Sequence, residues 1–153
     1  MVNFTEDFTG FAGAGFAPTP GAGQLDSDLW RVTGLSDGDT SFGGTFTSGD
    51  FARGTDTDGG VTTGGVYAFD ISGNTILGVQ PAGSDFTPGS IVLEVPNDTG
   101  ETIDALEISY ELFVNNNASR GNAFGAAFEI VSGGTVVPGS RRAIIPVEIQ
   151  IHK

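Results

Sequence analysis

Between residues 66 and 114 the chain switches repeatedly from glycine-rich turns to short runs in which apolar and polar residues alternate. A period of two is the signature of β-strands that bury one face and expose the other. Residues 103–114 show it most clearly, because alternate positions there hold Leu106, Ile108, Tyr110, Leu112 and Val114. The alternation predicts an all-β fold.

The same pattern predicts strands at 3–8, 29–33, 40–46, 66–71, 75–80, 91–95, 103–114, 124–131 and 144–151. Turn residues at 72–74 and 96–100 predict two hairpins, 66–71 with 75–80 and 91–95 with 103–114. For residues 103–113 a helix is the alternative, since apolar residues there also have helical spacing. Residues 10–23 are rich in glycine and are expected to form a mobile loop.

The length of 153 residues suits one domain that buries a core of its own. Many short strands separated by Gly, Asn, Asp and Pro turns are typical of an antiparallel β-sandwich or jelly roll. A β-roll is the weaker alternative, because the calcium-binding nonapeptide of such folds is not matched. We therefore predict an antiparallel β-sandwich of the jelly-roll type.

Acidic residues dominate the charge, with 19 Asp and Glu against 6 Lys and Arg and a net charge of −13. Such a chain repels phosphates, so we expect no direct nucleic-acid partner. No apolar stretch approaches the ~20 residues of a spanning helix, so we expect no membrane insertion. The residues that follow Met1 do not have the charged and then apolar pattern of a signal peptide. If the protein is secreted, we therefore expect that its signal peptide is absent from this sequence.

Three pairs of the form Asp-x-Asp are the candidate metal ligands, because carboxylate oxygens suit calcium. We prefer Asp26 and Asp28, since the strand expected from Leu29 onward would anchor their loop. The alternative is that these residues only form turns by bonding the local backbone. Calcium is the one cofactor that the sequence suggests.

Trp30, with Arg31 beside it, is either a shelf for a sugar ring or a plug between two sheets. Catalytic chemistry has little support. The chain has no cysteine, its single histidine is His152, and nothing selects a pair of carboxylates for hydrolysis. We therefore expect no enzyme, with a carboxylate-dependent hydrolase as the weakest alternative.

Residues 8–11, 15–30, 49–54, 60–67 and 77–81 carry a family likeness, most specific in Gln-Leu-Asp-Ser-Asp at 24–28 and Gly-Asp-Phe-Ala-Arg-Gly at 49–54. The chain resembles a non-catalytic β-sandwich module of large secreted bacterial proteins, which often also carry extracellular nuclease or cell-surface domains. The resemblance implies a lectin-like jelly roll, a secreted or extracellular location, and attachment to a polysaccharide or another cell-surface component. Arg53, in the second block, joins Trp30 and Arg31 as a candidate ligand-binding residue.

The likeness ends near residue 122, so we expect a β-sandwich module at 1–122 and terminal strands at 123–153 packed on the same domain. The net charge is −15 up to Asn115 and +2 beyond it. The terminal segment is either a native last strand, with Pro146 at an edge, or an end rejoined near residues 121–128. A module shortened at this end would leave an open sheet edge, which predicts a homo-oligomer. The alternative function is a self-associating envelope or filament component.

Overall fold

The computed structural model describes residues 4–57, 59–97, 100, 108–113, 123–128 and 144–152. Apart from one 3-10 turn, η1 (Gly49–Phe51), the regular structure of these residues is β, which confirms the predicted all-β class for this part of the chain. No helix in it is long and apolar enough to cross a membrane. The strands are β1 (Phe11–Ala17), β2 (Gly23–Asp26), β3 (Trp30–Thr33), β4 (Thr55–Asp56), β5 (Gly65–Ile71), β6 (Asn74–Gln80), β7 (Gly89–Pro96), β8 (Ala123–Phe128) and β9 (Ile144–His152).

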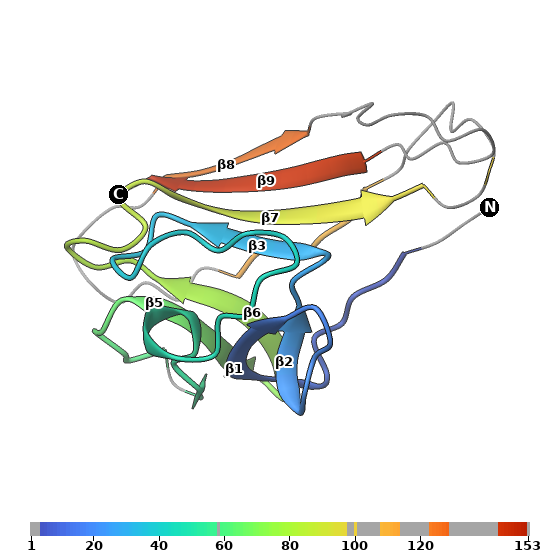
Figure 1. The fold of residues 1–153 in the computed structure, drawn as a ribbon. Coiled ribbons are helices and arrows are strands. Elements are labelled where there is room, and N and C mark those ends of the chain that lie inside the picture. The colour runs from blue at the N-terminus through green and yellow to red at the C-terminus, as the bar shows by residue number, and fades with distance from the viewer. Residues whose placement is uncertain are drawn as a thin grey trace.

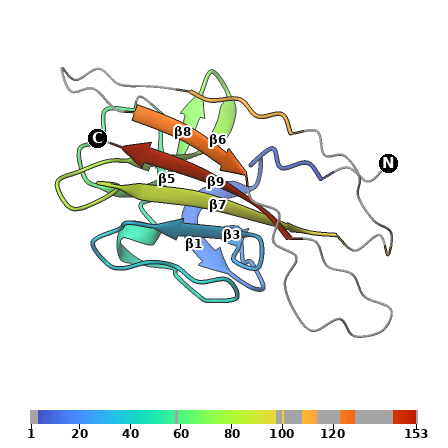
Figure 2. The same cartoon turned by 90° about the horizontal axis from the view of Figure 1, so that it is seen from above.

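The strands form three small sheets with the orders β1-β2, β3-β7-β9-β8 and β4-β5-β6. Figure 1 shows the four-stranded sheet above β1, β2, β5 and β6, and Figure 2 shows its strands side by side. Every pair in that sheet is antiparallel, as is β5 with β6. The pairs β1 with β2 and β4 with β5 are parallel, so the expectation of purely antiparallel pairing is wrong for these short strands.

Both sides of β7 are occupied by strands that are distant in sequence. Ile91 is opposite Val32 of β3 on one side and opposite Ile149 of β9 on the other. The predicted hairpin of 91–95 with 103–114 is therefore wrong, because β7 has no edge left for it. Residues 108–113 are not a strand, and residues 103–107 and 114 lie outside the described residues.

The glycine-rich segment 10–23 contains β1 and the start of β2, which corrects the expectation of a mobile loop. Glycine allows close packing there: Gly15 has φ +91, and a Cβ at Gly15 would lie 2.0 Å from the carbonyl oxygen of Phe46. Beside it, Phe16 and Phe46 exchange two backbone hydrogen bonds of 2.8 Å each. That bridge is all that forms of the strand predicted at 40–46, and residues 4–8 are not a strand.

One hydrophobic cluster joins the three sheets. β1 contributes Phe11 and Phe16, while the four-stranded sheet contributes Trp30, Val32 and Ile91. Its other buried members are Leu25, Leu35, Phe51, Val66, Ala68, Leu77 and Phe86. Because residues from all three sheets meet in this cluster, burial of a shared core holds the small sheets together.

The strands predicted at the end of the chain join the same sheet as β3 and β7. β9 pairs with β7 over its whole length, from Gly89↔Ile151 to Pro96↔Ile144. β8 pairs with β9 only from Val147 onward. Pro146 is thus opposite Glu94 of β7 but beyond the end of β8, a place where a missing backbone N–H is tolerated.

Candidate functional site

The Asp26 and Asp28 loop is a tight turn between β2 and β3. The Asp26 carboxylate accepts a 2.8 Å hydrogen bond from the backbone N–H of Asp28, and the Asp26 carbonyl accepts one of 3.1 Å from Leu29. Asp26 is half-buried and Asp28 is exposed. This is the turn-forming role of aspartate, and one Asp26 oxygen is already in use.

The donor chemistry of this loop suits calcium, but two carboxylates are short of the 6–8 oxygens that the ion takes. Among the described residues the structure contains no group of three or more His, Cys, Asp or Glu side chains that could hold a metal ion. Backbone carbonyls and water would have to complete the coordination of an ion at Asp26 and Asp28. Calcium at this loop stays a prediction.

Trp30 and Arg31 point to opposite sides of β3, because successive side chains of a strand alternate. Trp30 is only 6% exposed and belongs to the core, where its ring centroid lies 5.3 Å from that of Phe8. This burial fits the plug interpretation and leaves no ring face at Trp30 for a surface shelf.

Arg31, on the other side, has its guanidinium carbon 5.5 Å from the centroid of the Phe42 ring. Phe42 is 36% exposed. The next residue, Gly43, donates a 3.1 Å backbone hydrogen bond to the carbonyl of Ser27, so loop 41–43 lies against the turn that carries Asp28. A Cβ at Gly43 would lie 3.4 Å from a carboxylate oxygen of Asp28. We call Asp28, Arg31 and Phe42 the Arg31 surface.

Arg31 forms no ion pair with a carboxylate of the described residues, although acids outnumber bases about three to one in the chain. Arg53 with Asp50 is the ion pair recorded among the described residues, and Arg31 makes neither an ion pair nor a hydrogen bond with them. Its guanidinium therefore lies on a half-exposed aromatic ring, and no acceptor in the described part of the chain satisfies its donors. Nε is buried, so only the two terminal nitrogens of the guanidinium are placed to bind the oxygen atoms of a ligand.

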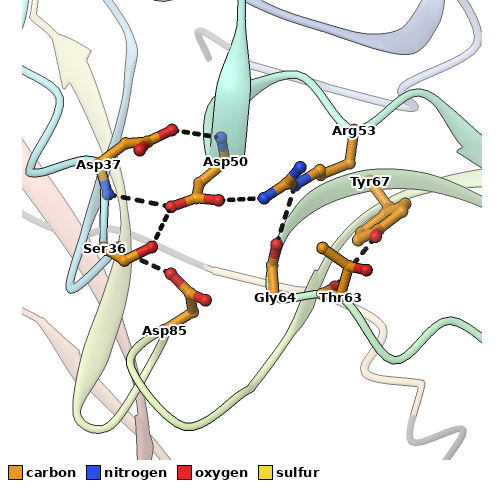
Figure 3. A network of polar contacts seen from close by, with 8 residues as sticks. All are labelled: Ser36, Asp37, Asp50, Arg53, Thr63, Gly64, Tyr67 and Asp85. Atoms are coloured by element: carbon orange, nitrogen blue, oxygen red, sulfur yellow. Dashed lines mark hydrogen bonds and ion pairs between the residues drawn. The ribbon is translucent and has the colours of Figure 1, made fainter.

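Arg53 belongs to a different cluster, shown in Figure 3. Its guanidinium forms an ion pair with Asp50 and donates a 2.9 Å hydrogen bond from Nε to the carbonyl of Gly64. Trp30, Arg31, Asp26 and Asp28 are not among its polar partners. The predicted ligand-binding residues are thus divided between two places.

Asp50 is the centre of this second cluster. One of its oxygens accepts hydrogen bonds from the Ser36 hydroxyl at 2.6 Å and the Asp37 backbone N–H at 2.9 Å, and the other faces Arg53. The Asp50 N–H donates in return to the Asp37 carboxylate at 2.9 Å. Asp85 accepts a 2.7 Å hydrogen bond from the backbone N–H of Ser36. The cluster ties η1 to the loops at residues 36, 64 and 85.

The charge of Asp50 is stabilised within the fold. Burial alone would raise its pKa, but hydrogen bonds from Ser36 and Asp37 together with the charge of Arg53 outweigh it, so the pKa of Asp50 is lowered. Both carboxylate oxygens are occupied by donors of the chain itself. An anion held this way works as a structural anchor.

Close packing around the cluster explains the glycine at position 64. A Cβ there would lie 2.0 Å from a carboxylate oxygen of Asp85, which is itself buried. Nearby, the Tyr67 hydroxyl donates a 3.0 Å hydrogen bond to the carbonyl of Thr63, and burial raises the pKa of Tyr67. A larger residue at 64 would force the two loops apart.

Sequence reasoning missed both Phe42 and Asp50. The spacing of Asp50 and Arg53, three residues apart across one turn, was the available signal for the ion pair. No local signal links Phe42 to Arg31, because the contact joins a strand to a loop eleven residues away. Comparison with protein-family models, with curated proteins and with solved structures finds no match.

Proposed function

We propose that this chain is a non-enzymatic accessory domain that attaches to carbohydrate outside the cell through the Arg31 surface. The observation that carries the proposal is the guanidinium of Arg31, which rests on a half-exposed phenylalanine and has no acceptor among the described residues. Because Trp30 is buried, we propose Phe42 in its place as the aromatic residue that contacts the sugar.

The three members of this surface have complementary chemistry for a sugar. An aromatic ring offers an apolar face to the C–H groups of a pyranose. Arg31 can donate hydrogen bonds to hydroxyl oxygens, and the exposed carboxylate of Asp28 can accept them. A few polar groups around an apolar face are the usual composition of small-molecule binding sites.

The non-enzymatic part of the proposal is supported by Asp50. Its carboxylate accepts hydrogen bonds from Ser36 and Asp37 and pairs with Arg53, and all three contacts stabilise its charged form. A general acid or base needs a pKa near the working pH, whereas the pKa of Asp50 is lowered from an already acidic value.

The proposal also includes the type of β-sandwich and the location of the protein outside the cell. A β-sandwich of jelly-roll, lectin-like topology is supported by the core that the three sheets share, although β1 with β2 and β4 with β5 pair in parallel. The pairing of β9 with β7 fits a module at 1–122 whose terminal strands, 123–153, pack on the same domain. With the resemblance to modules of secreted bacterial proteins, this supports an extracellular or cell-surface location.

Glycan binding tests the proposal directly. On a glycan array the wild-type chain is expected to retain a defined set of sugars, and affinity for the best of them is then measured by calorimetry. Arg31→Ala and Phe42→Ala are each expected to weaken that affinity by about tenfold, because a charge-assisted hydrogen bond or a stacking face is lost.

Phe4→Ala is the matched control, since Phe4 is also an exposed phenylalanine but lies outside the Arg31 surface. It should leave the affinity within about twofold, a change below the energy of one net hydrogen bond. An array on which the wild type binds no glycan, or equal affinities for wild type and both variants, would contradict the proposal.

Calcium is tested separately by thermal unfolding. If Asp26 and Asp28 contribute to a site, calcium at about ten times its Kd should raise the Tm by about 3–5 °C relative to chelator, because the ion binds only the folded state. Asp28→Asn should abolish the difference. Superimposed melting curves with calcium and with chelator would rule out this site.

A further inference from the structure

Strand β6 is an edge strand of its sheet among the described residues, so one side of its backbone has no strand partner there. In the described part of the chain its backbone pairs with β5 alone, through Gly65↔Gln80 to Ile71↔Asn74. Figure 2 shows the β5–β6 hairpin projecting beyond β8, on the side away from β1 and β3. In an antiparallel pair, every second residue directs its N–H and C=O away from the partner.

The hairpin turn identifies these residues. Ser72 and Gly73 have φ 56 and φ 85, the two positive values of a type I′ turn, which makes Ile71 and Asn74 the first hydrogen-bonded pair. Counting from Asn74, the backbone groups of Thr75, Leu77 and Val79 point outward. They form a row of three donors and three acceptors.

The edge of β3 differs from this edge because another part of the chain covers it. Thr40 donates a 2.9 Å backbone hydrogen bond to the carbonyl of Val32, and its buried hydroxyl accepts one of 2.7 Å from the Val32 N–H. Covering an edge with a loop prevents pairing with other chains. Among the described residues no hydrogen bond from another segment reaches the outward backbone groups of Thr75, Leu77 and Val79.

The β6 strand also lacks the charged residues that would discourage pairing with another chain. Its sequence, Asn-Thr-Ile-Leu-Gly-Val-Gln, has no charged residue and no proline, which are the residues that usually protect an edge. In a chain with a net charge of −13, two copies repel each other over most of their surfaces. An uncharged edge is where this repulsion is smallest.

The outer face of the hairpin adds apolar area next to the edge. Val66, Ala68 and Leu77 face the core, so Phe69 and Ile76, opposite each other, lie on the outer face. The Phe69 ring stacks on Tyr67 at 5.3 Å, and a Cβ at Gly78 would lie 2.2 Å from it. Phe69 and Ile76 are only partly buried.

We infer that β6 pairs antiparallel with β6 of a second copy, so that two β4-β5-β6 sheets become one continuous sheet across a two-fold axis. A second copy fits because the edge is complementary to itself: a rotation centred on Leu77 places Thr75 opposite the partner's Val79. Such isologous contacts are the commonest form of soluble dimer. The inference does not depend on carbohydrate binding at the Arg31 surface.

Sedimentation velocity on the full chain over about a hundredfold range of concentration tests the dimer, whose population must rise with concentration. Added salt should strengthen it, because salt screens the repulsion between acidic copies. Thr75→Pro removes an outward N–H twice per dimer and should weaken dimerisation about 30-fold, equivalent to ~2 kcal/mol. Thr75→Ala keeps that N–H and should dimerise like the wild type.

Hydrogen exchange of the wild type gives a second measurement that stands even if Thr75→Pro fails to fold. The amides of Thr75, Leu77 and Val79 should exchange quickly in dilute protein and slowly in concentrated protein. A chain that stays monomeric throughout, or equal dimerisation by the proline and alanine variants, would overturn the inference. Protection of these amides in the monomer would also overturn it, since another segment would then cover the edge.

Discussion

Asp50→Ala is expected to lower the free energy of unfolding by about 3 kcal/mol, near the lower end of the range for breaking a buried ion pair. The Asp50 side chain is 3% exposed, but that of Arg53 is 30% exposed, so water can partly solvate the guanidinium left behind. Ser36 and the Asp37 N–H lose their acceptor as well. Urea unfolding at pH 7 measures the change, which corresponds to a Tm lower by about 6–12 °C.

Glu111→Ala serves as the control, because Glu111 is exposed and the substitution removes the same charge. Its effect should stay within about 0.5 kcal/mol, as for most surface substitutions. If Asp50→Ala is no more destabilising than Glu111→Ala, the cluster around Asp50 does not anchor the loops.

The pH dependence follows from the lowered pKa of Asp50, in which hydrogen bonds from Ser36 and Asp37 and the charge of Arg53 outweigh the effect of burial. A carboxylate with a depressed folded-state pKa stabilises the fold fully above its unfolded pKa of about 3.9 and loses that contribution as pH falls through the folded value. The stability gap between wild type and Asp50→Ala should therefore be constant near neutral pH and shrink below about pH 4. A gap that widens on acidification would contradict this account.

Phe16→Ala should be at least as damaging, with a loss of about 3–5 kcal/mol, because it removes a whole ring from a closely packed core. Phe16 is 0% exposed, and its backbone bonds to Phe46 hold the surrounding chain in place, so the cavity has little freedom to collapse. Thermal unfolding followed by circular dichroism is the measurement, with a Tm drop on the order of 10 °C or more.

Phe4→Ala is again the matched comparison, because Phe4 is 42% exposed. Its Tm should change by no more than about 2 °C, as expected for a surface position in a chain of this length. Similar Tm values for the two alanine variants would mean that Phe16 is not part of a shared core.

The Arg31 surface and the cluster around Asp50 differ in how much of each could be predicted from the sequence. The sequence pattern suggested Trp30, Arg31, Asp26 and Asp28 as candidates because they are near neighbours at the start of a patterned strand. Their true partners were not found, since Phe42 and Phe8 reach them from loops. Ser36 and Asp85, which belong to the Asp50 cluster, are 49 positions apart in the sequence. A local sequence pattern cannot predict a contact over that separation.

The amino-acid sequence by itself determined the strands whose signals are local. β5 and β6 form as predicted because apolar alternation and the Ser72–Gly73 turn act within a few residues. β3, β7 and β9 were recognisable for the same reason.

Only the tertiary structure decided which strands pair and which aromatic groups are exposed. β7 lies between β3 and β9, and the glycine-rich β1 forms against Phe46 because long-range burial compensates for its poor strand propensity. The alternation of apolar and polar residues shows that one face of a strand will be buried, but it does not show which segment will cover that face. The neighbours of each strand therefore depend on how distant segments pack into one core.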